Sequence, residues 1–132
     1  MTAESPRTGL ADSLLRQIAE ALATLHAKGT RDAIDLRSLP LTAADRAELE
    51  EALGRGEVSA RLEIAGQSEL WETAYAGVWW LRHMGVGDQV AAESIEITPL
   101  PDLLASHPDD IGLAAARLTA ELQDKAEEAR HV

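Results

Sequence analysis

The sequence predicts an α+β fold of two layers, in which helices pack on one face of a largely antiparallel sheet of about four strands. Two amphipathic helical patterns and a short strand pattern precede three consecutive strand patterns, and a further helical pattern follows them. The three consecutive strands are expected between Gly54 and Thr98, with all three tryptophans on the middle one. The predicted order is therefore helix, strand, helix, three strands and helix.

The length of 132 residues favours a single domain, which we expect to cover residues 10–128. Residues 1–9 are expected to form a flexible tail, and residues 129–132 a frayed end. The first helix is expected to begin at Leu10 and to stop at Gly29, because apolar residues recur at helical spacing between them. Its buried stripe consists of Leu10, Leu14, Ile18, Leu22 and Leu25, widened by Leu15 and Ala21.

A short strand is expected at residues 33–36, with Ile34 and Leu36 on one face. A second helix follows, because the hydroxyl of Thr42 is well suited to accept a free backbone N–H at a helix start. Asp45 adds negative charge near the positive end of that helix. Leu49, Ala52 and Leu53 form the expected buried face, and Gly54 ends the helix.

Residues 57–65 alternate between apolar and polar side chains, which is typical of a strand with one packed face. The apolar set is Val58, Ala60, Leu62 and Ile64. A hairpin at Gly66 is expected to lead into one strand over residues 70–83, in which Gly77 marks a bulge.

The next strand, at about residues 89–98, is expected to send Ile95 and Ile97 inward. Leu103 and Leu104 are expected in a single helical turn packed on the sheet. The last helix is expected to begin at Pro108, because proline is tolerated in the first helical turn. Its expected buried stripe is Ile111, Ala115, Leu118 and Leu122.

The formal net charge of -11 makes binding to nucleic acid or to an anionic membrane surface unfavourable. The charge has two interpretations, a solvated surface that keeps the protein in solution or a field that steers a basic partner. The absence of cysteine excludes disulfides, thiol catalysis and cysteine-held metal clusters in this chain. Without a recognisable secretion signal or membrane-spanning stretch, a cytoplasmic location is the expectation.

The titratable residues show no recognised catalytic or metal-binding spacing. The four histidines are scattered over different predicted elements, so no metal or other cofactor is expected. Four glutamates fall on neighbouring strands, where they are either an acid–base pair or the solvated face of a sheet. These residues are Glu69, Glu72, Glu93 and Glu96.

The adjacent Trp79 and Trp80 are the more informative pair. Successive side chains of a strand point to opposite faces, so one indole is expected in the core and the other on the open face. Exposed indoles are enriched at interfaces. The alternative is that a helix or a loop covers the second indole, since tryptophan is highly buried on average.

Four stretches together resemble a known family. They are Ile-Asp-Leu-Arg-Ser-Leu-Pro-Leu at 34–41, Leu-Gly-Arg-Gly-Glu-Val at 53–58, Glu-Thr at 72–73 leading into Gly-Val-Trp-Trp at 77–80, and Ile-Glu-Ile at 95–97. As a set they resemble the C-terminal conserved domain of the hydrogenase expression and formation protein HupH, also called HyaF. The resemblance covers about residues 10–122.

The resemblance implies a non-catalytic accessory protein in the maturation of uptake nickel–iron hydrogenases. Such a protein is expected to act by binding a hydrogenase subunit or another maturation protein, and a homodimer is a further expectation because sheet edges tend to be paired. The alternatives are a small enzyme that uses strand carboxylates and a small-molecule or metal carrier. The family motifs and the alternation of side chains along the strands together indicate six candidate partner-binding residues: Trp71, Trp79, Trp80, Glu57, Glu72 and Glu96.

Overall fold

The computed structural model describes residues 6–63 and 66–130. The described chain forms two compact units, one up to Pro99 and one from Leu100 onward. The elements of the first unit are α1 (Leu10–Lys28), β1 (Asp32–Asp35), η1 (Leu36–Ser38), α2 (Ala43–Leu53), β2 (Ser59–Glu63), β3 (Gln67–Glu72), β4 (Val78–Met84) and β5 (Val90–Ile97). The second unit holds η2 (Asp102–Leu104) and α3 (Pro108–Arg130).

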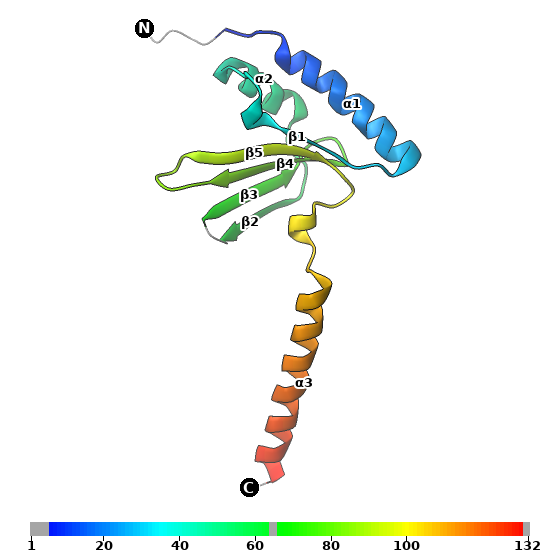
Figure 1. The fold of residues 1–132 in the computed structure, drawn as a ribbon, viewed down its shortest axis with the longest axis vertical. Helices are drawn as coiled ribbons and strands as arrows, with labels where there is room; N and C mark the ends of the chain where they lie inside the picture. Colours follow the sequence, from blue (N-terminus) through cyan, green and yellow to red (C-terminus); the bar gives the residue numbers. More distant parts are fainter. Residues whose placement is uncertain (1–5, 64–65, 131–132) are drawn as a thin grey trace. The chain divides into compact units, whose positions relative to one another are not determined.

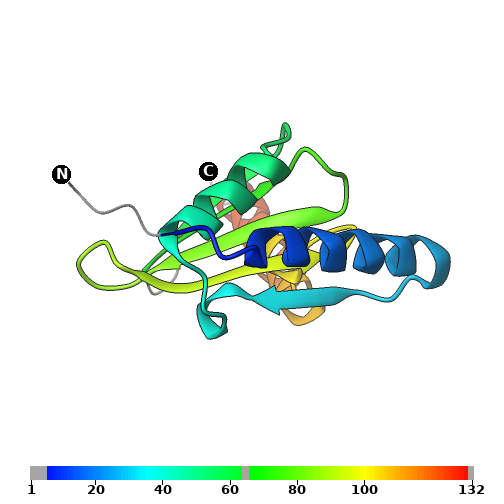
Figure 2. The same ribbon diagram turned by 90° about the horizontal axis from the view of Figure 1, so that it is seen from above.

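The first unit has the predicted two layers. Its sheet is antiparallel throughout, with the strand order β1-β5-β4-β3-β2, and α1 and α2 lie on one face of it (Figures 1 and 2). The α+β class and the helices on one face are therefore confirmed. The sheet has five strands where about four were expected.

The additional strand arises at Gly77. Residues 70–83 were expected to form one strand with a bulge, but β3 ends at Glu72 and β4 begins at Val78. Gly77 lies in the connecting turn with a φ of 90°, a backbone angle that glycine adopts at little cost. The chain reverses there, so the prediction of one strand carrying all three tryptophans is wrong. Trp71 lies on β3, directly opposite Trp80 of β4.

The hydrophobic core lies between the sheet and the two helices. Trp79 and Trp80 point to opposite faces, as predicted, because Trp80 belongs to this core and Trp79 does not. The predicted stripe of α1 and the paired Ile34 and Ile95 also face this layer. The buried core residues are Ala11, Leu14, Ile18, Ala21, Ile34, Leu36, Leu49, Leu53, Trp71, Val78, Trp80, Ile95 and Ile97.

The start of α2 confirms Thr42 as the N-cap. The Thr42 hydroxyl accepts the Asp45 N–H at 3.0 Å, and the Asp45 carboxylate accepts the Thr42 N–H at 3.2 Å, which completes a capping box. The same carboxylate also accepts the N–H and the hydroxyl of Thr8, at 2.7 and 2.6 Å. Residues just before α1 are thus fastened to α2, although a flexible tail was expected there; residues 1–5 of that tail lie outside the described residues.

The apolar residues of β2 do not face the core. Ser59 pairs with Trp71 in the register, so Ser59 and Arg61 share the helix-covered face. Ala60 and Leu62 therefore point to the opposite face and are only half-buried, and Val58, just before the strand, is 45% exposed. The predicted alternation is present, but the packed face is not, because β2 is an edge strand outside the cover of the helices. Ile64 lies outside the described residues.

The second unit, taken by itself, consists of η2 and the 23-residue helix α3. The helix begins at Pro108, as predicted, but buries none of its residues. The expected buried stripe is wrong: Ile111, Leu118 and Leu122 are each more than half exposed. Their helical spacing makes α3 amphipathic, but spacing alone does not provide a surface that covers them. No helix in the described part of the chain combines the length and apolar character needed to span a bilayer.

Candidate functional site

The predicted partner-binding residues separate onto different surfaces. All three indoles are buried, with Trp71, Trp79 and Trp80 at 1%, 3% and 0% exposure, so an exposed indole is not found. Trp71 and Trp80 face the helices, whereas Trp79 lies on the opposite face of the sheet, called the distal face below. There the indole N–H of Trp79 donates to the backbone carbonyl of Thr98 at 3.1 Å.

Three of the predicted partner-binding residues lie together on the distal face. Glu72 of β3 and Glu96 of β5 lie directly across from Trp79 on either side of it. The Cα atoms of the two glutamates are therefore two strand spacings apart, about 10 Å, with Trp79 between them. Glu57 is exposed and precedes β2, and its neighbours Gly56 and Val58 both bond to the backbone of Glu72, at 2.7 and 2.8 Å.

One hydroxyl–imidazole pair lies on the same face. The Ser68 hydroxyl and the Nδ1 of His83 are 2.7 Å apart across β3 and β4. A serine nucleophile also needs a group that orients the histidine. Among the described residues no carboxylate is bonded to His83, so the pair lacks that third member. The described residues also contain no group of three or more histidine or carboxylate side chains placed to hold a metal ion.

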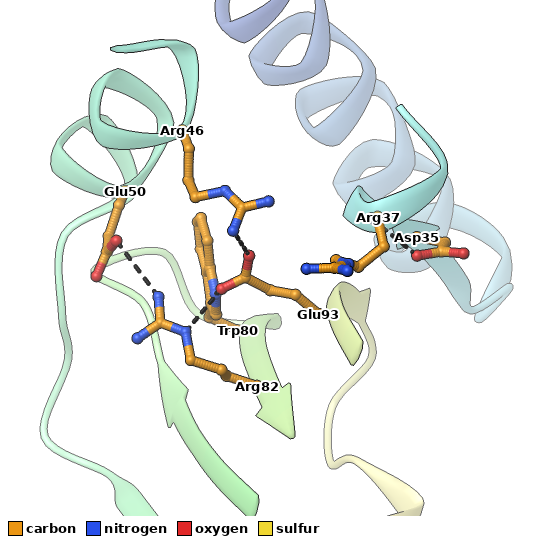
Figure 3. Close-up of polar contacts among 7 residues, drawn as sticks. All are labelled: Asp35, Arg37, Arg46, Glu50, Trp80, Arg82 and Glu93. Atoms are coloured by element: carbon orange, nitrogen blue, oxygen red, sulfur yellow. Dashed lines mark hydrogen bonds and ion pairs between the residues drawn. The ribbon is translucent and has the colours of Figure 1, made fainter. Parts of the chain in front are cut away.

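The helix-covered side contains a buried ionic network around Glu93, which Figure 3 shows. Glu93 of β5 is 2% exposed. One of its oxygens contacts the Arg46 guanidinium of α2 at 2.7 Å. The other oxygen accepts the Nε–H of Arg82 at 2.7 Å and the indole N–H of Trp80 at 3.0 Å.

This network connects α2 to the middle of the sheet. Arg82 also pairs with Glu50 of α2 at 3.6 Å, and the Arg37 side chain of η1 points toward Glu93 (Figure 3). Both oxygens of Glu93 are engaged, so this carboxylate is not free to act as a base or a metal ligand. Glu93 was one of the glutamates considered for a solvated face or an acid–base pair, and the structure instead buries it as an ion-pair partner.

Trp80, which donates to Glu93, stacks on Trp71, and Trp71 in turn is covered by Arg55. The rings of Trp71 and Trp80 stack with centroids 5.8 Å apart and an interplanar angle of 6°. The guanidinium carbon of Arg55 lies 3.9 Å from the centroid of the Trp71 ring. A guanidinium over an indole is attracted by the ring electrons and covers it from water. Trp71 therefore acts within the core, not as a contact surface.

An apolar groove between α1 and α2 offers a surface that could receive another molecule. Thr8 and Asp45 hold the beginnings of the two helices together, and from there the helices diverge (Figure 2). The groove, of about 280 Å³, opens toward the end of α2 and the β3–β4 turn. It is lined by Leu15, Ile18, Ala19, Leu22, Ala52, Leu53 and Tyr75.

The lining of this groove decides what it can bind. Six of its seven residues are aliphatic, and the seventh, Tyr75, is 53% exposed and adds the only phenolic hydroxyl of the chain. Such a surface fits apolar side chains and has few groups for chemistry. The sequence contained one signal of it, because Leu15 widens the stripe of α1 beyond what one packed face requires. No sequence pattern around Tyr75 predicted that this side chain would line the groove.

Comparisons with known proteins show what the chain is similar to. The family model "HupH hydrogenase expression protein, C-terminal conserved region" matches residues 10–124. The hydrogenase expression/formation protein HoxQ of Azotobacter vinelandii is 31% identical over 109 residues, which are 83% of this chain and 36% of that protein. The hydrogenase-1 operon protein HyaF of Escherichia coli is 34% identical over 96 residues, 73% of this chain and 34% of that protein.

A solved structure supports the same relationship. The hydrogenase expression protein HupH from Thiobacillus denitrificans superposes with a TM-score of 0.85 at 42% sequence identity, covering 90% of this chain and 99% of that one. The chain spans about a third of the length of the curated relatives it matches.

Proposed function

Since the chain belongs to the family of HupH hydrogenase expression proteins, we propose that it is a non-catalytic accessory protein that acts by binding other proteins during hydrogenase maturation. The proposed partner is a subunit of an uptake nickel–iron hydrogenase or another maturation protein. The proposed place of action is the cytoplasm. Family membership supports the hydrogenase setting, and the apolar groove supports the mode of action.

The observation that carries the proposal is the apolar groove between α1 and α2. A solvent-open surface of leucine, isoleucine and alanine side chains gains free energy when apolar side chains of another protein cover it. Tyr75 at its edge is a residue type that often anchors interfaces, because it combines a large ring with a hydroxyl. The occupant we propose is an apolar segment of the partner with basic flanks, since the chain carries a net charge of -11.

The candidate catalytic groups support binding over catalysis. Glu93 is fully paired with two arginines, and Glu72 and Glu96 are separated by Trp79. The hydroxyl–imidazole pair of Ser68 and His83 lacks an orienting carboxylate among the described residues.

The proposal is tested by filling the groove with a long side chain. Ala19 is exposed on α1 and lines the groove, so Ala19→Arg should block it without disturbing the helix, for which arginine has a high propensity. We expect capture of a hydrogenase subunit or maturation protein from hydrogenase-producing cells to fall by about thirtyfold or more, as for loss of an interface hot spot. Capture is measured by quantitative mass spectrometry with the purified chain as bait.

The matched control is Ala27→Arg. Ala27 is another exposed alanine of α1, two turns further along, and it does not line the groove. This variant should capture the partner as well as the original chain does. Capture of no protein of the hydrogenase system would contradict the function, whereas equal capture by Ala19→Arg would move the binding surface away from the groove.

A further inference from the structure

The outer edge of β2 carries backbone groups that point away from the sheet. The strand is at one end of the strand order and pairs with β3 alone among the described strands. The Glu72 N–H donates to the Val58 carbonyl at 2.8 Å, so even-numbered residues of this segment bond toward β3. Antiparallel pairing alternates, and the N–H and C=O groups of Ser59, Arg61 and Glu63 therefore point to the open edge.

The side chains of this edge are charged and of opposite sign. Arg61 and Glu63 are both exposed on the helix-covered side of the sheet, beyond the reach of the helices. Neither forms an ion pair with another residue in the described part of the chain. On the distal side, Leu62 lies between them in sequence and is half-buried. An open edge of this kind is a template for a further strand.

We infer that β2 pairs with β2 of a second copy of this chain, antiparallel about a two-fold axis at Leu62. In this arrangement each Arg61 lies opposite the Glu63 of the second copy, and the two Leu62 side chains meet at the axis. The result is a continuous sheet through both copies, held by backbone hydrogen bonds between the Arg61 and Glu63 positions. The inference is independent of the partner proposed above, because it uses a different surface.

The register follows from the hydrogen-bond pattern and the charges. Only registers that place odd-numbered residues opposite each other satisfy the open backbone groups. An axis at Arg61 would put two arginines face to face, and like charges directly opposite are destabilising. An axis at Ala60 would pair Arg61 with Ser59 and form no ion pair. The axis at Leu62 instead forms two Arg61–Glu63 pairs.

The occupant is a second copy because the strand is complementary to itself. One strand carries both the cation and the anion, which is the property that a two-fold interface requires. The net charge of -11 on each copy opposes association at long range, so the pairing is weak and depends on concentration and on screening by salt. Dimerisation should therefore be measured at physiological salt and high protein concentration.

Cysteine cross-linking tests the register directly, because the chain has no cysteine of its own. The two Leu62 positions would form a non-hydrogen-bonded pair, with Cα atoms about 4.5 Å apart, which is within disulfide range. We expect Leu62→Cys to form a disulfide-linked dimer under mild oxidation. The matched control is Ala60→Cys, on the same strand and face, whose two copies would be about 13 Å apart along the strands. It should cross-link at least about tenfold less.

Charge reversal provides a second, reversible test. Arg61→Glu replaces both Arg61–Glu63 pairs by like charges and should raise the dimer dissociation constant by about tenfold or more. Adding Glu63→Arg to that variant exchanges the two charges and should restore dimerisation, which is measured by sedimentation equilibrium. Circular dichroism and thermal unfolding confirm that each variant is folded.

Three outcomes would overturn the inference. The first is a protein that remains monomeric at high concentration and physiological salt. The second is equal cross-linking at positions 60 and 62, which would contradict the register. The third is dimerisation of Arg61→Glu at full strength, which would mean that the copies meet elsewhere.

Discussion

At the scale of single residues, Glu93 shows how much the surroundings of a side chain decide its role. A buried carboxylate is expensive unless cations and hydrogen-bond donors replace the water it loses. Arg46, Arg82 and the indole N–H of Trp80 together provide that replacement. Because one arginine comes from α2 and the other from β4, the compensation also holds the helix in position on the sheet.

Replacing Glu93 by glutamine tests this role. Glutamine has the same shape but no charge, so Arg46 and Arg82 would lose their shared anion. We expect a loss of about 2–3 kcal/mol in the free energy of unfolding, less than for a fully buried pair because both arginines are partly exposed. Urea unfolding followed by tryptophan fluorescence measures the change.

The control is Glu50→Gln, which removes the outer partner of Arg82. That contact is longer, at 3.6 Å, and the Glu50 side chain is 36% exposed, so the cost should stay within about 1 kcal/mol. Equal destabilisation by the two substitutions would contradict the central place of Glu93 in the network.

At the scale of elements, the groove exists because two helices are joined at one end and apart at the other. Asp45 connects them, since its carboxylate completes the capping box of α2 and accepts two hydrogen bonds from Thr8 just before α1. The hydrogen bonds from Thr8 are the main cause that lowers the pKa of Asp45 from 3.8 to about 2, and those from Thr42 lower it further. A depressed pKa means that the folded state prefers the ionised carboxylate.

This preference predicts a specific acid dependence. The stabilisation is complete above the unfolded pKa of about 4 and is lost as the pH falls toward 2. Asp45→Asn keeps the shape but removes the charge, so its melting temperature should lie below that of the original chain at pH 5. The difference in melting temperature between the variant and the original chain should become smaller between pH 4 and pH 2. Differential scanning calorimetry at several pH values measures both, and a constant difference across this range would contradict the assignment.

At the scale of the whole molecule, every residue of the hydrophobic core between the sheet and the helices lies between Ala11 and Ile97, within the first unit, whereas Pro101 is a buried residue of the second unit. The second unit contributes an amphipathic helix whose apolar residues are exposed. A core that is complete within one unit should fold without the other.

Removal of residues 100–132 tests that independence. We expect the remaining chain to unfold cooperatively, with a melting temperature within about 5 °C of the original, which corresponds to about 1 kcal/mol. Calorimetry and far-ultraviolet circular dichroism report the transition and the sheet. A broad transition, or a drop of more than about 15 °C, would show that folding depends on residues after Pro99.

Features that depend on neighbours along the chain could be predicted from the residues alone. The bounds of α1 at Leu10 and Gly29 and the cap at Thr42 follow from local spacing and backbone preferences, and the family follows from short stretches in a set order. Features that depend on contacts between residues far apart in the chain could not be predicted in this way. Gly77 turns the chain instead of bending a strand, because β3 and β4 pair across it and stack Trp71 on Trp80. Glu93 is buried because arginines from α2 and β4 reach it, and the groove forms because α1, α2 and Tyr75 meet around it. Alternation and helical spacing describe one segment at a time, whereas burial is a property of the surface that another segment places against it.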